Sequence, residues 1–465
     1  MDYLSRDPLR RAVSRLNRQE LLSRLHAVRA LRMARGLRLL ADRNTPQTIE
    51  LALVPWVLTP AQVRFFHGIT RLMVDALTRL PALYARDPAI RGIVPFTPVQ
   101  ESWIRLAGRV HGDPLALLGR LDSTATFSHP QWRRTFQMLE PNAVGVGGIH
   151  YAPASASVVL DVLGDVFERA FPGRRVVPMP DPRDLLFDEM INVSRRLGRR
   201  LRGVALIENT DFTTGTDEFE SLARYFAARG LKAVVIDPRE LRLSHGRLVA
   251  KGQEVDLLYR DCELNEFIEM EADGRRLRAV RAAIQQGRLI SGLLWEFDQK
   301  SCWEIFTDAA YARYFSSAQR RLFHQHLPWT RLVRDEKVSD PSDRRVELTT
   351  HIRRHKNRLV LKPNTLYGGQ GVVIGDTVSQ SMWEQTLHKA LRGRRRYVVQ
   401  ERVRIATEEF PRLKHGRIHE VERRVVSGFF VNSTGVGLIG RFSEDPVVNV
   451  SRGGGLLSAL MIQEQ

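Results

Sequence analysis

One stretch of this sequence decides the fold: Leu359-Val-Leu-Lys362-Pro-Asn-Thr-Leu-Tyr-Gly368-Gly-Gln-Gly371-Val-Val-Ile374. Its pattern predicts a strand that carries a lysine, a glycine-rich loop and a second strand. Glycines let backbone N–H groups turn toward phosphate oxygens, and a lysine supplies a positive charge to them. The stretch is not a Walker loop, because no Gly-Lys-Ser/Thr follows the glycines and a strand comes next. Taken alone, it fits a phosphate cradle and an ordinary β-hairpin turn equally well.

A second apolar strand follows at Arg396-Tyr-Val-Val-Gln400-Glu401, and the apolar pattern continues to Val403. Such a strand with polar groups at its end can line an apolar cleft and bond to the edge of an adenine. On its own it is an ordinary strand. After the lysine–glycine unit it resembles the adenine-binding hinge of ATP-grasp enzymes. The predicted ATP-binding residues here are therefore Lys362, Gly368, Gly369, Gln370, Gly371, Gln400, Glu401 and Val403.

Two pairs of polar residues lie far upstream, Arg120-Leu-Asp122 and Glu140-Pro-Asn142. Residues two apart on a strand point to the same face, so each pair would project into one cleft. Together they offer three oxygen ligands, which suit Mg²⁺, and one guanidinium, which can stabilise the charge of an acyl phosphate. For either pair alone, a surface ion pair or the start of a loop is the plainer interpretation.

In this order the motifs resemble the circularly permuted ATP-grasp family, which includes the synthetase domain of glutathionylspermidine synthetase. In that family an Arg-x-Asp and a Glu-x-Asn motif precede the two nucleotide lysines. The resemblance identifies these lysines as Lys300, in Glu296-Phe-Asp-Gln-Lys300, and Lys362, in Lys362-Pro363. It covers roughly residues 110 to 460 by motif order.

The resemblance implies an ATP-dependent ligase that joins a carboxylate to an amine through an acyl phosphate. Lys300 and Lys362 would hold the phosphates of ATP, Arg120 would steady the acyl phosphate, and Mg²⁺ would be bound by Asp122, Glu140 and Asn142. The expected cofactors are thus ATP and Mg²⁺. The substrates would be a small-molecule or peptide carboxylate and an amine, whose identities the sequence leaves open, as it does the oligomeric state.

The expected architecture is mixed, α+β with an α/β part: a circularly permuted ATP-grasp fold with a Rossmann-like subdomain and an N-terminal helical layer. The predicted divisions are residues 1–100, a basic helical region; 101–200, with the metal-binding strands; 201–300, the Rossmann-like part; and 301–465, the nucleotide-binding part. Helices are predicted over 5–43, 60–84 and 217–229, and strands over 203–208, 231–236 and 255–259. No Gly-x-Gly-x-x-Gly follows the first of these strands, so no dinucleotide fingerprint is present.

The chain has 71 lysines and arginines against 52 aspartates and glutamates, a net charge of +19. This charge fits an anionic partner without naming it. It leaves open a basic, non-catalytic protein that binds nucleic acid or an anionic surface, and the motifs leave open a degenerate ATP-grasp domain that only binds nucleotide. No helix-turn-helix, zinc or RNA-binding signature occurs, so no specific nucleic acid is expected.

Two cysteines, Cys262 and Cys302, show neither metal-knuckle nor disulfide spacing, which favours a reducing cytoplasm. The apolar runs are too short to cross a bilayer, so no membrane is expected as a partner. The N-terminal residues lack the compact apolar core of a secretory signal.

Overall fold

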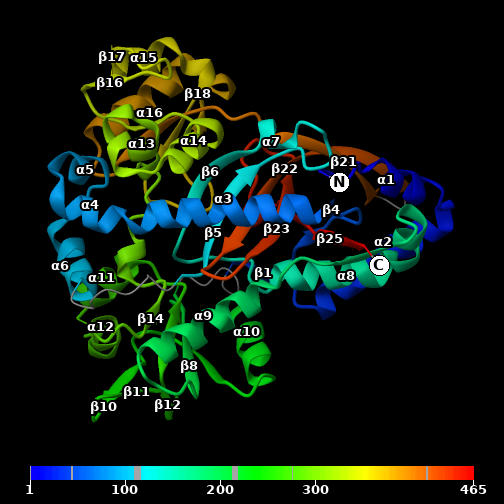
Figure 1. The fold of residues 1–465 in the computed structure, drawn as a ribbon, viewed down its shortest axis with the longest axis horizontal. Coiled ribbons are helices and arrows are strands. Elements are labelled where there is room, and N and C mark those ends of the chain that lie inside the picture. Colours follow the sequence, from blue (N-terminus) through cyan, green and yellow to red (C-terminus); the bar gives the residue numbers. More distant parts are fainter. Residues whose placement is uncertain are drawn as a thin grey trace.

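The computed structural model describes residues 2–42, 45–108, 117–211, 218–274, 276–414 and 417–464. Figure 1 shows an upper lobe in yellow and orange, a lower lobe in green, and a central sheet flanked by the N-terminal helices, where both chain ends lie. The long helix α3 (Pro60–Thr78) runs across the middle of the molecule. It begins at the Thr59 cap with a proline in its first turn, as the sequence predicts.

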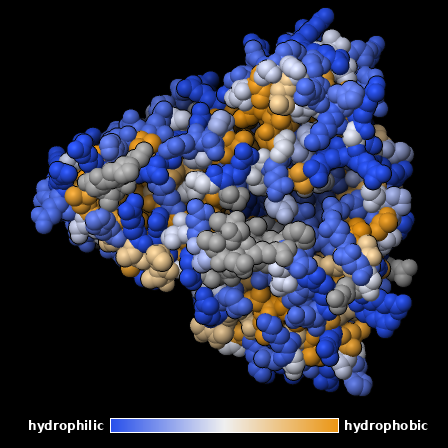
Figure 2. Space-filling view, turned by 180° about the vertical axis from the view of Figure 1, so that it is seen from behind, coloured by the Kyte–Doolittle hydropathy of each residue, from blue (hydrophilic) through white to orange (hydrophobic). Residues whose placement is uncertain are grey.

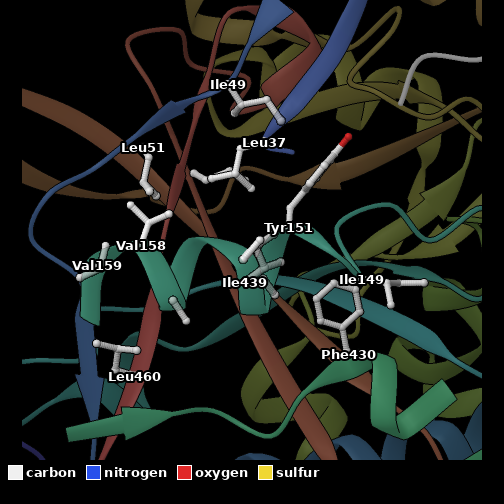
Figure 3. Packing of buried hydrophobic residues seen from close by; sticks show 14 of the residues in the cluster. Leu37, Ile49, Leu51, Ile149, Tyr151, Val158, Val159, Phe430, Ile439 and Leu460 are labelled. Carbon is white, nitrogen blue, oxygen red and sulfur yellow. The ribbon is translucent and has the colours of Figure 1, made fainter. Parts of the chain in front are cut away.

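The central sheet has seven strands, in the order β3-β24-β23-β22-β5-β6, with β21 paired to β22. Phe429 and Leu438 lie in the core cluster beneath α3, and Phe430 and Ile439 lie in the cluster around α8 (Tyr151–Ala170). Figure 3 shows Phe430 and Ile439 near Ile149 on this second side. The strands are β3 (Glu50–Leu51), β5 (Gly119–Thr124), β6 (Gln137–Asn142), β21 (Ala406–Lys414), β22 (Arg417–Val431), β23 (Val436–Ser443) and β24 (Gly455–Leu457).

The upper lobe contains the stretch on which the fold assignment rests. Strands β18 (Leu359–Pro363) and β19 (Val373–Ile374) pair antiparallel, with Val360 opposite Ile374, so the strand-loop-strand prediction is confirmed. Their sheet has the order β15-β20-β18-β19 and packs against helices α15 and α16. The lobe comprises α13 (Cys302–Thr307), α14 (Ser317–His326), β15 (Thr330–Leu332), β16 (Lys337–Ser339), β17 (Arg345–Glu347), α15 (Leu348–Arg354), α16 (Gln380–Arg392) and β20 (Tyr397–Glu401).

The lower lobe is a parallel α/β layer, as predicted. Its sheet has the order β14-β13-β8-β9. The predicted strand over 255–259 begins two residues late, because Val255 ends the hairpin strand before it. Asp217, the predicted start of a helix, lies outside the described residues. The elements are α6 (Pro98–Ala107), β8 (Gly203–Ile207), α10 (Glu218–Ala227), β9 (Lys232–Ile236), β10 (Arg242–Ser244), β11 (Arg247–Ala250), β12 (Gln253–Val255), β13 (Leu257–Arg260), α11 (Leu264–Ala272), α12 (Arg278–Gln285) and β14 (Leu289–Ile290).

The N-terminal region differs from its prediction. Helices α1 (Asp7–Ser14) and α2 (Arg18–Ala34) form and pack against α8, but β1 (Arg38–Asp42) and β2 (Thr45–Thr48) follow, so a helical pattern up to residue 43 is wrong. Gly36 has φ +71°, a left-handed conformation that commonly ends a helix. The helix predicted over 60–84 is likewise split, since α3 ends at Thr78 and α4 (Leu80–Arg86) begins with Pro81 in its first turn.

Strands from the beginning of the chain pair with strands from its end. Strand β3 pairs with β24, and β4 (Trp56–Leu58) pairs with β25 (Ala459–Glu464), which also pairs with β7 (Arg174–Pro178). Across the described ranges, no helix is long and apolar enough to span a membrane. The remaining elements are α5 (Pro88–Ile93), α7 (Trp132–Thr135), α9 (Pro182–Arg196) and the short 3₁₀ helices η1 (Leu293–Trp295), η2 (Ala309–Tyr314), η3 (Lys356–Arg358), η4 (Gly375–Thr377) and η5 (Val450–Arg452).

Candidate active site

A cavity of about 1030 Å³ is lined by residues of the central sheet and of both lobes. Figure 2 shows the molecular surface hollowed between the upper and lower lobes. Of the residues that the sequence predicts for a site, all but Gly371 line this cavity. A cavity of this size suits a ligand as large as a nucleotide together with a second small molecule.

The two upstream pairs lie on neighbouring strands. Strands β5 and β6 pair antiparallel, with Arg120 opposite Asn142 and Asp122 opposite Glu140. Residues directly opposite each other share a face of the sheet, so all four side chains are turned to the cavity. The Asn142 side chain donates to the Arg120 carbonyl at 3.3 Å. The strand geometry expected from the two-residue spacing is therefore present.

Asp122 lies between two arginines. Arg120 Nε donates to Asp122 Oδ1 at 2.7 Å, and Arg441 Nη2 lies 2.8 Å from Asp122 Oδ2. Burial disfavours the charged carboxylate, but the two guanidinium groups outweigh it and lower the pKa of Asp122 to about 2. The ion pair that was the plainer interpretation of Arg120-Leu-Asp122 thus exists, but it is buried in the cavity wall. The sequence gives no sign of Arg441, because its partner depends on how β22 and β23 register with β5.

Lys300 connects the central sheet to the glycine loop. It lies in the turn before α13, where its Nζ is 3.3 Å from Glu140 Oε2 and donates to the Leu366 carbonyl at 2.7 Å. The Lys300 backbone N–H also bonds to the carbonyl of Asn364. Lys300, which only the family resemblance suggested, therefore lies beside Glu140 on β6 and also contacts the glycine loop.

Lys362 is held by Gln400. Lys362 Nζ donates to Gln400 Oε1 at 2.7 Å, while Gln400 Nε2 donates to Thr330 Oγ1 at 3.0 Å and to the Leu139 carbonyl at 3.3 Å. Burial lowers the pKa of Lys362 to about 8, although the nearby Glu140 carboxylate opposes this shift. Gln400 thus connects the lysine strand of the upper lobe to β6 of the central sheet.

The glycine loop approaches the segment that follows β23. Gly368, Gly369 and Gly371 all have positive φ, between 67° and 70°. A Cβ at Gly369 would collide with Val447, and Arg452 Nη1 donates to the Gly369 carbonyl at 3.1 Å. Gly371, in contrast, packs beneath Pro363 and does not line the cavity. The loop conformation therefore requires glycine, and the loop is held from outside as well as by its own strands.

The predicted hinge lies at the end of β20. Glu401 and Val403 line the cavity, and the Glu401 N–H donates to the Trp329 carbonyl at 2.8 Å. Burial raises the pKa of Glu401. This backbone, together with Val360 and Ile374 in the cavity lining, gives an apolar slot with polar groups at its edge, which is the environment expected for a base.

Among the acidic residues that line the cavity, five with raised pKa values were missed by the sequence interpretation. Burial raises the pKa of each carboxyl, to about 7 for Glu208, Glu218 and Asp298, about 6 for Asp261 and about 8 for Glu263. Glu208 follows β8, and Asp261 and Glu263 follow β13. Ligand sites of parallel sheets lie at these carboxyl ends, so the strand pattern itself contained a signal for them.

The donor set fits Mg²⁺ in its chemistry. Glu140 and Asp122 offer carboxylates and Asn142 an amide oxygen, and Mg²⁺ prefers such oxygen ligands together with phosphate and water. In the described ranges no group of three or more His, Cys, Asp or Glu is placed to hold a metal. The amide oxygen of Asn142 would be the third protein ligand of this set. Among the charged groups that the structure describes, Lys300 pairs with Glu140, whereas two arginines pair with Asp122.

Comparison with known proteins finds no matching protein-family model and no matching curated protein. Among solved structures, a glutathione synthetase-like effector from Globodera pallida, in its apo form, matches 98% of this chain and 99% of its own, with a TM-score of 0.61 and 11% identity. The chain shares the fold of this effector. At this identity the likeness extends to the fold alone, and the mixed α/β class predicted from the sequence is confirmed.

Two ATP-grasp structures align over part of the chain. A RimK domain protein from Sphaerobacter thermophilus matches 54% of this chain and 91% of its own, with 14% identity and a TM-score of 0.26. The ATP-grasp ligase PsnB, complexed with a minimal precursor, matches 54% and 90%, with 12% identity and a TM-score of 0.25. TM-scores this low do not indicate a shared fold.

Proposed function

We propose that this chain is an ATP-grasp ligase that forms an amide bond between a carboxylate and an amine, with release of ADP and phosphate. One observation supports this proposal above the others. Lys300 contacts both Glu140 and the carbonyl of Leu366, so the upstream acidic pair and the glycine loop face each other across one cavity. A nucleoside triphosphate with its metal ion needs positively charged side chains for its phosphates and oxygen ligands for the metal, on opposite sides of the phosphate chain.

In this proposal the positively charged residues bind phosphate groups and the residues with side-chain oxygens bind Mg²⁺. Lys300 and Lys362 bind phosphate oxygens, and the backbone N–H groups of Gly368, Gly369 and Gln370 cover them. Mg²⁺ held by Glu140, Asn142 and Asp122 would neutralise the phosphates. The substrate carboxylate attacks the γ-phosphate of ATP, and Arg120 steadies the acyl phosphate that forms. The amine then displaces phosphate from the acyl carbon.

The lower-lobe carboxylates are suited to binding the amine substrate and accepting its proton. Glu208, Asp261 and Glu263 face the cavity, and burial raises their pKa values to about 7, 6 and 8, respectively. A carboxylate in this state attracts an ammonium group and can accept the proton that an amine must lose before it attacks. Small-molecule or peptide carboxylates and amines therefore remain the proposed substrates.

The kinship with the circularly permuted group that contains the glutathionylspermidine synthetase domain is part of the same proposal. Its support is the chain order, with Arg120-x-Asp122 and Glu140-x-Asn142 ahead of Lys300 and Lys362. The proposed location is a reducing cytoplasm, since Cys262 and Cys302 are both free thiols and both buried.

ADP release from ATP and Mg²⁺ tests this function, measured against panels of carboxylates and amines added singly and in pairs. ADP is expected only when both substrates are present, with an amide product found by mass spectrometry. If ATP binds and no pair releases ADP, the chain is a degenerate nucleotide-binding domain. If ATP does not bind and the chain instead binds DNA or RNA with steep salt dependence, the basic binding protein is the correct interpretation.

A further inference from the structure

A second cavity of about 570 Å³ lies between α2, the segment around β3, and strands β21 to β23. In the part of the chain that the structure describes, its charged lining consists of four arginines, Arg29, Arg32, Arg412 and Arg423, and one glutamate, Glu50. The rest of the wall is largely apolar and includes Phe410 and Phe442, whose ring centroids are 5.5 Å apart. The cavity is therefore cationic and aromatic at once, and none of the residues predicted for the active site lines it.

Two arginines of this cavity, Arg32 and Arg423, are partly withdrawn from water. Arg32 donates through Nη1 to the Ile49 carbonyl at 3.1 Å, but its buried Nε has no hydrogen-bond partner among the described residues. Burial also lowers the pKa of Arg32. The Arg423 side chain is 6% exposed and lies over the Phe442 ring. A buried guanidinium donor without an acceptor costs free energy, which an anion in the cavity would recover.

We propose that this cavity is a second ligand site, which binds an anionic head group, carboxylate or phosphate, carried on an aromatic or short aliphatic body. Guanidinium groups bind either anion through paired N–H donors. The body would lie against Phe410 and Phe442, and the head would reach Arg32, Arg412 and Arg423. The volume lies within the usual range for small-molecule sites, roughly 300–1,000 Å³.

The cavity shares a segment with the active site. Glu444 begins this segment, residues 444–454, and its carboxylate pairs with Arg412 at 3.3 Å and Arg423 at 2.9 Å. Farther along, Val447 packs against Gly369 and Arg452 donates to its carbonyl. Val450 lines both cavities. One segment thus touches the arginines of the second cavity at one end and the glycine loop at the other.

A bound anion would compete with Glu444 for Arg412 and Arg423. The Glu444 side chain is 62% exposed, and exposed ion pairs are weak, so a ligand held by apolar contacts as well can replace it. Release of Glu444 frees the segment that holds Gly369. The ligand would therefore loosen the glycine loop and act as a regulator of the neighbouring site.

Binding is tested with phenyl phosphate and phenylacetate, which separate the two head groups, and with benzyl alcohol as the neutral control. Calorimetry on the full chain without ATP should find one site for at least one of the anions and none for the alcohol. Arg32→Gln and Arg412→Gln should each weaken binding by about tenfold or more, and Arg18→Gln, an exposed arginine of the same helix, should not. Absence of binding by both anions, or equal weakening in Arg18→Gln, overturns the site.

Coupling is tested by hydrogen exchange of the glycine loop, residues 365–371, with the binding anion present and absent. At an anion concentration that just saturates the wild-type chain, exchange of these amides should become several-fold faster, and the increase should be clearly smaller in Arg32→Gln at the same concentration. Unchanged exchange in the wild type at saturation overturns the regulatory role. Neither measurement uses ATP or ligase activity, so the outcome is independent of the proposed function.

Discussion

Glu140 Oε2 lies 3.3 Å from Lys300 Nζ, and the same lysine donates to the Leu366 carbonyl at 2.7 Å. One cation thus contacts both a carboxylate of the central sheet and the backbone of the glycine loop. Glu140 belongs to the edge strand β6, where its neighbour Pro141 is tolerated because an edge strand has an unpaired side. The contact is where the two halves of the proposed site meet.

Glu140→Gln is the sharpest test of the metal assignment. It keeps the size of the side chain but removes a ligand charge, so Mg²⁺-dependent ADP formation should fall by more than about 100-fold. Loss of a residue that only hydrogen-bonds to a metal ligand usually lowers activity by no more than about 100-fold. The melting temperature should stay close to that of the wild type, because the Glu140 side chain is 24% exposed. Glu254→Gln, in an exposed pair with Arg247, is the control. Normal turnover by Glu140→Gln would exclude this carboxylate as a ligand.

Asp122→Asn should disturb the fold as well as the reaction, which the sequence alone does not suggest. The change leaves Arg120 and Arg441 buried beside a neutral amide, and breaking a buried ion pair costs about 3–5 kcal/mol. Urea unfolding at pH 7 measures this loss. Asp165→Asn, at a half-exposed aspartate that pairs with Arg24 and Arg169, should cost less than about 1 kcal/mol.

The stability loss in Asp122→Asn should also depend on pH in one direction. Because the pKa of Asp122 in the folded chain is about 2, below its ordinary value, its contribution to stability is complete above the unfolded pKa and is lost as the pH falls toward 2. The difference in unfolding free energy between wild type and Asp122→Asn should therefore shrink between about pH 4 and pH 2. A difference that stays constant over this range would contradict the charge interaction.

We expect the affinity for ATP to depend on pH through the charge of Lys362. Its pKa of about 8 means that it is charged below pH 8 and neutral above. Phosphate oxygens bind the charged form, so ATP affinity should fall by about tenfold from pH 7 to pH 9. Lys362→Ala should lower the affinity at pH 7 and remove this dependence. Fluorescence titration with a nucleotide analogue measures both, and unchanged affinity in Lys362→Ala would count against the phosphate role of the hairpin.

Much of the site was predictable because it depends on local geometry. A spacing of two residues on a strand fixes one face, which is why Arg120 with Asp122, and Glu140 with Asn142, were placed correctly relative to each other. The hairpin of Lys362 follows from apolar runs on both sides of the glycines. The position of Lys300 beside Glu140, in contrast, was suggested only by motif order, since nothing in its own sequence context indicates a turn beside β6.

The rest depends on contacts that no local pattern encodes. Arg441 reaches Asp122 only because β22 lies between β23 and β5 in the sheet, an order set by the whole chain. Gly36 was different: a glycine between Arg35 and Leu37 is a recognised helix end, and the repeated leucines obscured it. The acids after β8 and β13 were hidden among many charged residues, and burial, not sequence, makes their pKa values unusual.

Gly369→Ala tests whether the contact between the glycine loop and Val447 matters for ATP binding beyond the backbone strain that any side chain at Gly369 would cause. The glycine has φ +70° and a Cβ there would collide with Val447, so the substitution should both strain the loop and push it from residues 444–454. Gly230→Ala is the matched control, because Gly230 has φ +78° and open space around it. Strain alone should cost each variant about 1–2 kcal/mol of stability. Only Gly369→Ala should also weaken ATP binding, and Val447→Ala added to it should restore part of that affinity by removing the collision. Equal ATP affinity in Gly369→Ala and Gly230→Ala would show that the contact with Val447 does not position the loop.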